Sequence, residues 1–239
     1  QVSGRSVVRG TVTPGLERAE WQLRTDRGTA RSPSSRVGVV HHRPTLDVMA
    51  LQIRPRRTDS DTETTQVGEL VSAAFGDGGQ VARLVEALAA SPDALPGLEL
   101  VAVDTGTATD AGGGRETGAG DEESVVGHVM LTRGLLDARR ELVDVHVLGP
   151  LAVLPERQGQ GVGAALMRAA LDASGQAGAP AVFVEGDPGY YAAYGFVAAE
   201  PLGFRRPSLR IPAPAFQVRT GPAHEEWMTG TLVYSRVFW

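Results

Sequence analysis

Residues 151–164 read Leu151-Ala152-Val153-Leu154-Pro155-Glu156-Arg157-Gln158-Gly159-Gln160-Gly161-Val162-Gly163-Ala164. The stretch begins as an apolar strand and passes into a loop with glycine at three alternate positions. Glycine has no Cβ, so the N–H groups of such a loop stay open to a ligand. The helix predicted after the loop adds unpaired N–H donors and a partial positive charge at its N-terminus. We therefore expect this loop to cradle a pyrophosphate.

The residues downstream predict a helix, a buried strand and a turn. Apolar residues recur at helical spacing after Val162, and glycines at 175 and 178 end that pattern. Residues 181–184 form a short apolar run between Pro180 and Gly186, which is typical of a buried strand. A tyrosine-rich turn follows, with the sequence Gly186-Asp187-Pro188-Gly189-Tyr190-Tyr191-Ala192-Ala193-Tyr194-Gly195-Phe196.

Two motifs in this order resemble those of the GNAT N-acetyltransferase superfamily. Gln158-x-x-Gly161-x-Gly163 is similar to the superfamily's acyl-CoA-binding signature. The Tyr-x-x-x-Gly-Phe run that begins at Tyr191 is similar to its second landmark, at the usual distance downstream. Within the superfamily the chain looks most like an uncharacterised bacterial subgroup with a Leu-Gly-Pro-Leu-x-Val strand and a Gly-Asp-Pro-x-Tyr-Tyr turn.

The resemblance implies an α/β (α+β) GNAT fold, with a mixed, mostly antiparallel central sheet flanked by helices and a splay between two strands. We expect residues 49–200 to form the acetyltransferase domain and residues 201–239 to be a C-terminal extension that completes the sheet. Gly149-Pro150 interrupts the strand predicted over residues 145–154, and proline cannot donate to a strand ladder. A bulge there would separate this strand from residues 181–184. In the GNAT fold the pantetheine arm enters that gap.

Periodicity predicts the other elements. Helices are expected over residues 61–75 and 81–90, and strands over residues 50–54, 98–103 and 125–131. The glycine-rich residues 105–121 read as a hairpin connection. Residues 230–239 alternate like a final strand, in which Tyr234, Phe238 and Trp239 are expected to complete the core or to line the acceptor pocket.

The resemblance implies direct transfer of an acetyl group from acetyl-CoA to an amine of an unidentified acceptor, with no metal. The predicted cosubstrate-binding residues are Leu151, Ala152, Val153, Gln158, Gly159, Gln160, Gly161, Val162, Gly163 and Ala164. An N–H group on the edge of the 151–153 strand is the expected donor to the thioester oxygen. Tyr191 is the expected catalytic acid, because a phenol with a pKa near ~10 is protonated at neutral pH.

The general base is left unassigned. His128 and His146 lie on predicted central strands, where histidine is usually structural, and Glu185 and Glu141 are weaker candidates. The chain also departs from the superfamily pattern, since Val184 occupies the position, seven residues before Tyr191, where an asparagine is common. The departure concerns the strand before Tyr191 and leaves the glycine-loop motif unchanged.

Composition narrows the class of protein. The chain of 239 residues is 42% apolar and has a net charge of −5, so it has no overall basic footprint for nucleic acid. Its apolar runs are too short to cross a bilayer. Because the chain has no cysteine, a disulfide or a cysteinyl acyl-enzyme is excluded. We expect a cytoplasmic enzyme that acts on a small-molecule or peptide amine, without nucleic-acid or membrane partners, and a homodimer is compatible with this picture.

Residues 1–48 are rich in arginine and serine and have no sustained periodicity or apolar signal region. Such a stretch can serve as a transit peptide or a basic arm. We favour a disordered leader, or a stretch that is not native and precedes a start at Met49.

The sequence is also compatible with two other functions. Gly159-x-Gly161-x-x-Ala164 is a variant of the dinucleotide fingerprint, and Glu185 falls where a ribose-binding acid would sit in an NAD(P)-dependent oxidoreductase. The residues between the strand and the first glycine argue against the tight turn that this fold requires. The second alternative is a non-catalytic module that senses acyl-CoA.

Overall fold

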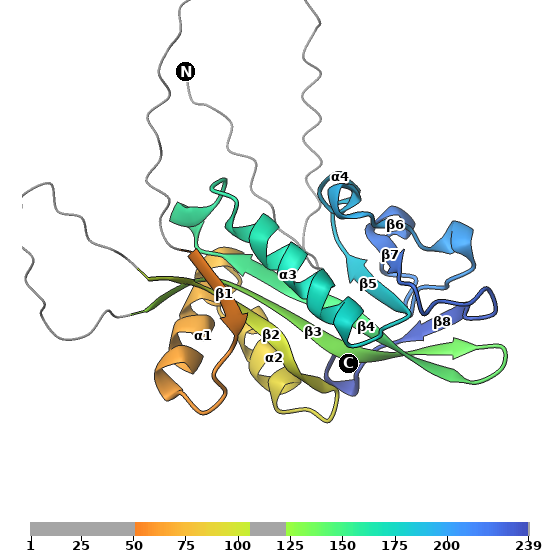
Figure 1. The fold of residues 1–239 in the computed structure, drawn as a ribbon, viewed down its shortest axis with the longest axis horizontal. Coiled ribbons are helices and arrows are strands. Elements are labelled where there is room, and N and C mark those ends of the chain that lie inside the picture. Colours follow the sequence, from red (N-terminus) through yellow and green to blue (C-terminus); the bar gives the residue numbers. More distant parts are fainter. Residues whose placement is uncertain (1–50, 106–122, 239) are drawn as a thin grey trace, which may run out of the picture.

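The computed structural model describes residues 51–105 and 123–238 (Figure 1). The predicted leader, most of the glycine-rich connection and Trp239 lie outside this part of the chain. The elements follow in the order β1 (Leu51–Pro55), α1 (Asp61–Phe75), α2 (Gln80–Ala89), β2 (Ala94–Asp104), β3 (Ser124–Ala138), β4 (Leu142–Val153), α3 (Val162–Gln176), β5 (Ala181–Glu185), α4 (Pro188–Tyr191), β6 (Val197–Ala198), β7 (Phe216–Thr220) and β8 (Gly230–Val233). Short 3₁₀ turns include η1 (Pro155–Arg157), η2 (Ala192–Tyr194), η3 (Glu200–Leu202), η4 (Ala213–Ala215) and η5 (Arg236–Phe238).

The described strands form one mixed sheet with the order β1-β2-β3-β4-β5-β7-β6. β8 lies outside this order and pairs with the C-terminal end of β3. All neighbouring pairs are antiparallel except β4 and β5, which are parallel. The predicted GNAT fold class is confirmed. The dinucleotide-binding alternative is wrong, because that fold requires a mostly parallel sheet of alternating strands and helices.

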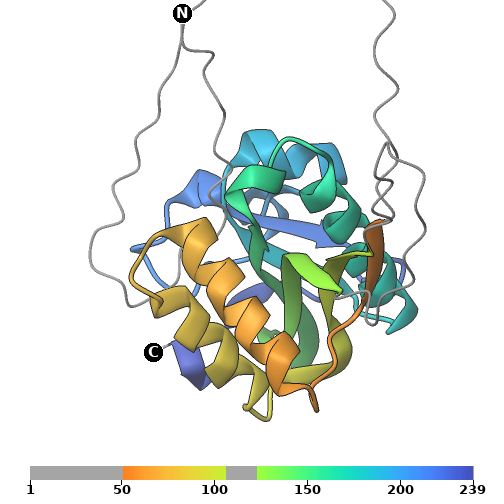
Figure 2. The same cartoon turned by 90° about the vertical axis from the view of Figure 1, so that its left-hand side faces the viewer.

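Helices cover both faces of the sheet (Figure 2). On one face α1 and α2 pack over apolar side chains such as Val101, Met130 and Phe183. On the other face α3 packs over Ala102, Val129 and neighbouring side chains. Because successive residues of a strand point to opposite faces, the two sets alternate along the central strands.

The start of α3 approaches the sheet closely at Gly127 on β3. A Cβ at Gly127 would lie 2.8 Å from Cδ1 of Leu166 and 2.9 Å from Cγ1 of Val162, both on α3. This close approach fixes the N-terminal turn of α3, and with it the glycine loop, against β3 and β4.

The predicted bulge lies in β4 at Gly149-Pro150. Between the pairs Val129–Leu151 and Leu131–Leu148, β3 advances two residues while β4 advances three. The parallel pairing of β4 with β5 is limited to His146–Val182 and Val147–Phe183, before the bulge. Beyond these pairs the two strands separate, as the sequence predicted.

The C-terminal segment differs from its prediction. The strand expected over residues 230–239 ends at Val233, and the chain then turns into η5. β8 pairs with β3 from Ala138 to Leu135, and beyond this point the same edge of β3 is occupied by β2, which pairs from Thr132 onward. Tyr234 and Phe238 nevertheless complete the core on the α1/α2 face, where both are buried.

We predict that Gly127→Val destabilises the protein by about 1–3 kcal/mol, because the new side chain must displace Leu166 and Val162 of α3. The control is Gly68→Ala in α1, where the nearest atom to the new Cβ lies 4.0 Å away. That substitution should leave stability unchanged or raise it by about 0.5–1 kcal/mol. Urea unfolding measures both changes, and equal midpoints for the Gly127→Val variant and the unmutated protein would contradict the close approach.

Candidate functional site

The glycine loop between β4 and α3 has the open backbone that the sequence predicted. Gly159 and Gly161 adopt left-handed conformations, with φ of 74° and 87°, and no atom lies within 4 Å of where their Cβ atoms would be. Gly161 is the N-cap of α3, and no side chain caps the helix there. The N–H groups of the first turn, which contains Val162, Gly163 and Ala164, therefore remain available to an anion.

Side chains of the loop fix it to the sheet. The Gln158 amide donates to the Val153 carbonyl at 3.1 Å, and Gln160 donates to the Glu156 carbonyl at 2.8 Å. The Arg157 guanidinium bonds Asp104 at the end of β2 at 2.6 Å. The side chain of Gln158 thus holds the loop against β4, while the glycines present the backbone.

The second part of the site is the gap between β4 and β5. Leu154 N–H donates to the Val126 carbonyl of β3, so the polar groups of Val153 and Leu151 point the other way, toward β5. Ala152 pairs with His128 of β3 and is buried. The strand edge predicted to meet the cosubstrate therefore faces the gap, directly before the glycine loop.

Tyr191 lies beside this gap on the α3 face. Its side chain is fully buried in the cluster that contains Val184 and Phe196. A Cβ at Gly186 would lie 2.3 Å from the Tyr191 ring, so this glycine, which follows β5, makes room for the ring. The Asp187 carboxylate accepts from Gly189 N–H at 2.9 Å and caps the short helix α4 that carries Tyr191.

The neighbouring tyrosines are arranged differently. The hydroxyl of Tyr190 lies 3.2 Å from where a Cβ of Gly163 would be, so Tyr190 reaches the first turn of α3. Burial, and then the hydrogen bond with Tyr194, raises the pKa of Tyr190. Tyr194 is half-buried, and its ring stands 5.4 Å from that of Tyr190.

Glu185, which the sequence offered as a weaker candidate for the general base, is the last residue of β5 and is only 3% exposed. The Tyr234 hydroxyl donates to its carboxylate. Burial raises the pKa of Glu185 to about 7, although the bond from Tyr234 opposes the shift. No periodic pattern links these residues in the sequence, so Tyr234 could not be recognised as part of this pair.

Of the other candidates for the general base, the two histidines are hydrogen-bonded to neighbouring side chains, and Glu141 lies in an exposed turn. His128 is buried on the α1/α2 side, and its Nε2 lies 2.9 Å from Glu99, which also bonds Arg56 at 2.7 Å. His146 contacts the Ser174 hydroxyl of α3 at 2.8 Å, and burial lowers its pKa. Glu141 is exposed in the turn between β3 and β4.

Within residues 51–105 and 123–238, no group of three or more His, Cys, Asp or Glu side chains could hold a metal ion. None of the helices in the same residues is long and apolar enough to cross a membrane.

Comparisons with known proteins agree with this geometry. The profile of the acetyltransferase (GNAT) family matches residues 98–204. The chain is 33% identical over 135 residues to YjhQ, an uncharacterized N-acetyltransferase of Escherichia coli K12, and the match covers 56% of this chain but only 65% of YjhQ.

Two solved structures are similar over most of the chain. The E. coli GNAT N-acetyltransferase YhbS in complex with CoA has a TM-score of 0.62 and 26% identity, covering 83% of this chain and 96% of YhbS. A GNAT acetyltransferase of Brucella melitensis in complex with acetyl-CoA has a TM-score of 0.57 and 26% identity, covering 80% of this chain and 99% of its own.

The raised pKa of Glu185 predicts a pH-dependent stability. A carboxyl group that ionises near 4.3 when unfolded but about 7 when folded stabilises the protein at low pH and loses that contribution as pH rises through 7. The Glu185→Gln side chain stays neutral at every pH. The free energy of unfolding of this variant, relative to that of the unmutated protein, should therefore rise by about 3 kcal/mol from pH 4 to pH 8.

Urea unfolding at several pH values measures this difference. Glu141→Gln, at an exposed site, is the control and should show no such trend. A constant difference between Glu185→Gln and the unmutated protein across this range would show that Glu185 ionises as an ordinary carboxyl group.

Proposed function

We propose that the chain is a member of the GNAT acetyltransferase superfamily and that it transfers an acetyl group from acetyl-CoA directly to an amine. The observation that carries this proposal is the uncapped glycine loop at the start of α3, placed directly beside the gap between β4 and β5. Solved structures similar over most of the chain hold acetyl-CoA or CoA. We also assign the chain to the subgroup with the Gly-Asp-Pro-x-Tyr-Tyr turn, and residues 49–200 to its acetyltransferase domain.

The cosubstrate would bind in two parts. The N–H groups of the loop and of the first turn of α3 would hold its pyrophosphate, with the help of the helix dipole. Its pantetheine arm would run along β4, where the polar backbone groups of Leu151 and Val153 point into the gap. This arrangement delivers the thioester to the place where β4 and β5 separate.

Transfer then needs a donor for the developing charge and a proton for the thiolate. An N–H group of the 151–153 strand edge would donate to the carbonyl oxygen, in the manner of an oxyanion hole. Tyr191, packed against Gly186 at the end of β5, would protonate the departing sulfur. The acceptor would be a small-molecule or peptide amine.

We predict that Gly161→Asp abolishes acetyl-CoA binding, because it places a carboxylate among the N–H groups meant for the pyrophosphate. The matched control is Gly178→Asp, just beyond the other end of α3. Both glycines have positive φ (87° and 76°), and neither has an atom within 4 Å of its Cβ position. The two variants thus carry the same backbone strain.

Isothermal titration calorimetry with acetyl-CoA, and with NADH as a second ligand, measures the outcome. Gly178→Asp should keep the affinity of the unmutated protein for acetyl-CoA. Binding of NADH but not of acetyl-CoA, or unchanged acetyl-CoA affinity in Gly161→Asp, would contradict the assignment of the loop.

We predict that Tyr191→Phe lowers turnover by about 10²-fold while acetyl-CoA affinity is kept, because only the proton donor is removed. CoA thiol release is measured with a panel of primary amines, amino acids, aminoglycosides and short peptides. Tyr194→Phe is the control, since Tyr194 lies on the same turn but is only half-buried and contacts Tyr190. Full activity of Tyr191→Phe would mean that solvent protonates the thiolate.

A further inference from the structure

Glu185 lies where β4 and β5 separate, on the face of the sheet opposite Tyr191. The last pair between these strands is Val147–Phe183, and Glu185 is two residues beyond it. Its side chain therefore shares a face with Phe183, which packs in the cluster under α1 and α2. Tyr191 packs in the cluster under α3, and its ring covers Gly186, the residue that follows Glu185 in the chain. The carboxylate and the phenol thus flank the end of β5 from opposite faces.

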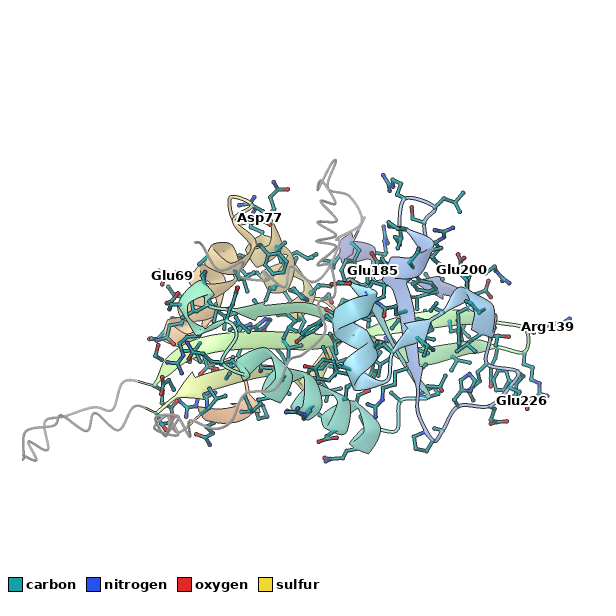
Figure 3. All side chains as sticks on the ribbon, turned by 90° about the horizontal axis from the view of Figure 1, so that it is seen from above. Glu69, Asp77, Arg139, Glu185, Glu200 and Glu226 are labelled. Atoms are coloured by element: carbon teal, nitrogen blue, oxygen red, sulfur yellow. The ribbon has the colours of Figure 1, made fainter. Side chains whose placement is uncertain are left out.

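The surroundings of Glu185 leave one of its oxygens unused. Oε1 accepts from the Tyr234 hydroxyl, whereas Oε2 is buried and has no hydrogen-bond partner among the described residues. Figure 3 places Glu185 near the middle of the molecule, while the labelled side chains of Glu69, Asp77, Arg139 and Glu226 lie toward its margins. A buried carboxylate oxygen without a donor is costly, unless a ligand supplies the donor.

We propose that Glu185 accepts the proton of the acceptor's ammonium group, and that Tyr234 is a positioning residue that orients the Glu185 carboxylate. This proposal rests on the acetyl transfer proposed above. It assigns the acid and the base of the reaction to the two faces of one gap, with the thioester between them.

The protons and bonds of the reaction balance. The Glu185 carboxylate takes one proton from the ammonium group, which becomes a neutral amine. The amine nitrogen then forms a bond to the thioester carbon, and the carbon–sulfur bond breaks. Tyr191 protonates the thiolate and recovers a proton from the amide nitrogen as it forms. Glu185 finally loses its proton to solvent, so one proton is released for each acetyl group transferred.

The charge environment of Glu185 suits this task. Its pKa, raised to about 7 by burial, lets it exist as a base and as an acid near neutral pH. Burial and the Tyr234 hydroxyl are the causes of the shift in the pKa of Glu185, and Asp144 of the adjacent strand β4 is exposed. On β4, His146 contacts Ser174 of α3, on the opposite face. On β7, Arg219 pairs with Val182 at the far end of β5. Asp187 and Arg236 are exposed.

The hydrogen bond from Tyr234 gives a second, specific expectation. A hydroxyl that donates to a carboxylate stabilises the charged form and so lowers the pKa. Without that bond the pKa of Glu185 should rise further. A purely structural role for Tyr234 would not move the pH dependence of the reaction in this way.

The test measures kcat as a function of pH, because kcat reports the groups that titrate in the complex with substrates. Acetyl-CoA is held saturating, and the acceptor is an amine of the panel that gives thiol release with the unmutated protein. We expect the kcat of the unmutated protein to rise through about pH 7 and then to level off. Glu185→Gln should lower the plateau about 10²-fold and remove the rise, with the affinity for acetyl-CoA unchanged.

Tyr234→Phe should keep the plateau and move the rise to higher pH. Glu141→Gln is the control and should match the unmutated protein in both respects. Glu185→Gln with the pH profile and kcat of the unmutated protein would overturn the proposal, as would an unmoved profile in Tyr234→Phe. If the unmutated protein bound acetyl-CoA but released no thiol with any amine, the proposed transfer itself would fail.

Discussion

The extra residue in β4 at Gly149-Pro150 is the constraint on which the rest of the site depends. Proline has no N–H to donate, and the bulge shifts the register of β4 against β3 by one residue. After the bulge β4 no longer pairs with β5, so the backbone groups of Leu151 and Val153 point into a gap instead of a ladder. A regular strand here would leave no place for a pantetheine arm. The glycine loop follows directly and would hold the other half of the cosubstrate.

The two apolar clusters give the gap two chemically different sides. On the α3 side Tyr191 is held by Phe196 and by the backbone at Gly186. On the α1/α2 side Glu185 is held by Tyr234, which follows the last strand of the sheet. Burial keeps water from both groups, which raises the pKa of the carboxyl group toward neutrality. The packing that stabilises the sheet therefore also sets the protonation state of the proposed base.

Much of this could be predicted from the sequence, because local patterns carry it. The glycine loop, the helix after it and the bulge at Gly149-Pro150 follow from residues adjacent in the chain, and the fold class follows from the family resemblance that two local motifs carry. The Glu185–Tyr234 pair did not, since its members are separated by 49 residues and meet only through the pairing of β7 and β8 with the sheet. The end of the last strand was also missed: alternation continues to residue 239, but β8 stops at Val233, beyond which β2 occupies the same edge of β3. Tertiary pairing decided both points.

The account places a thioester in the gap between β4 and β5, with Tyr191 on one side and Glu185 on the other. A crystal structure of the protein with bound acetyl-CoA tests this claim most directly. We expect the pyrophosphate on the N–H groups of the glycine loop, the pantetheine along Leu151 and Val153, and the acetyl group between the Tyr191 and Glu185 side chains. An acetyl group outside that gap, or a cosubstrate bound away from the glycine loop, would contradict it.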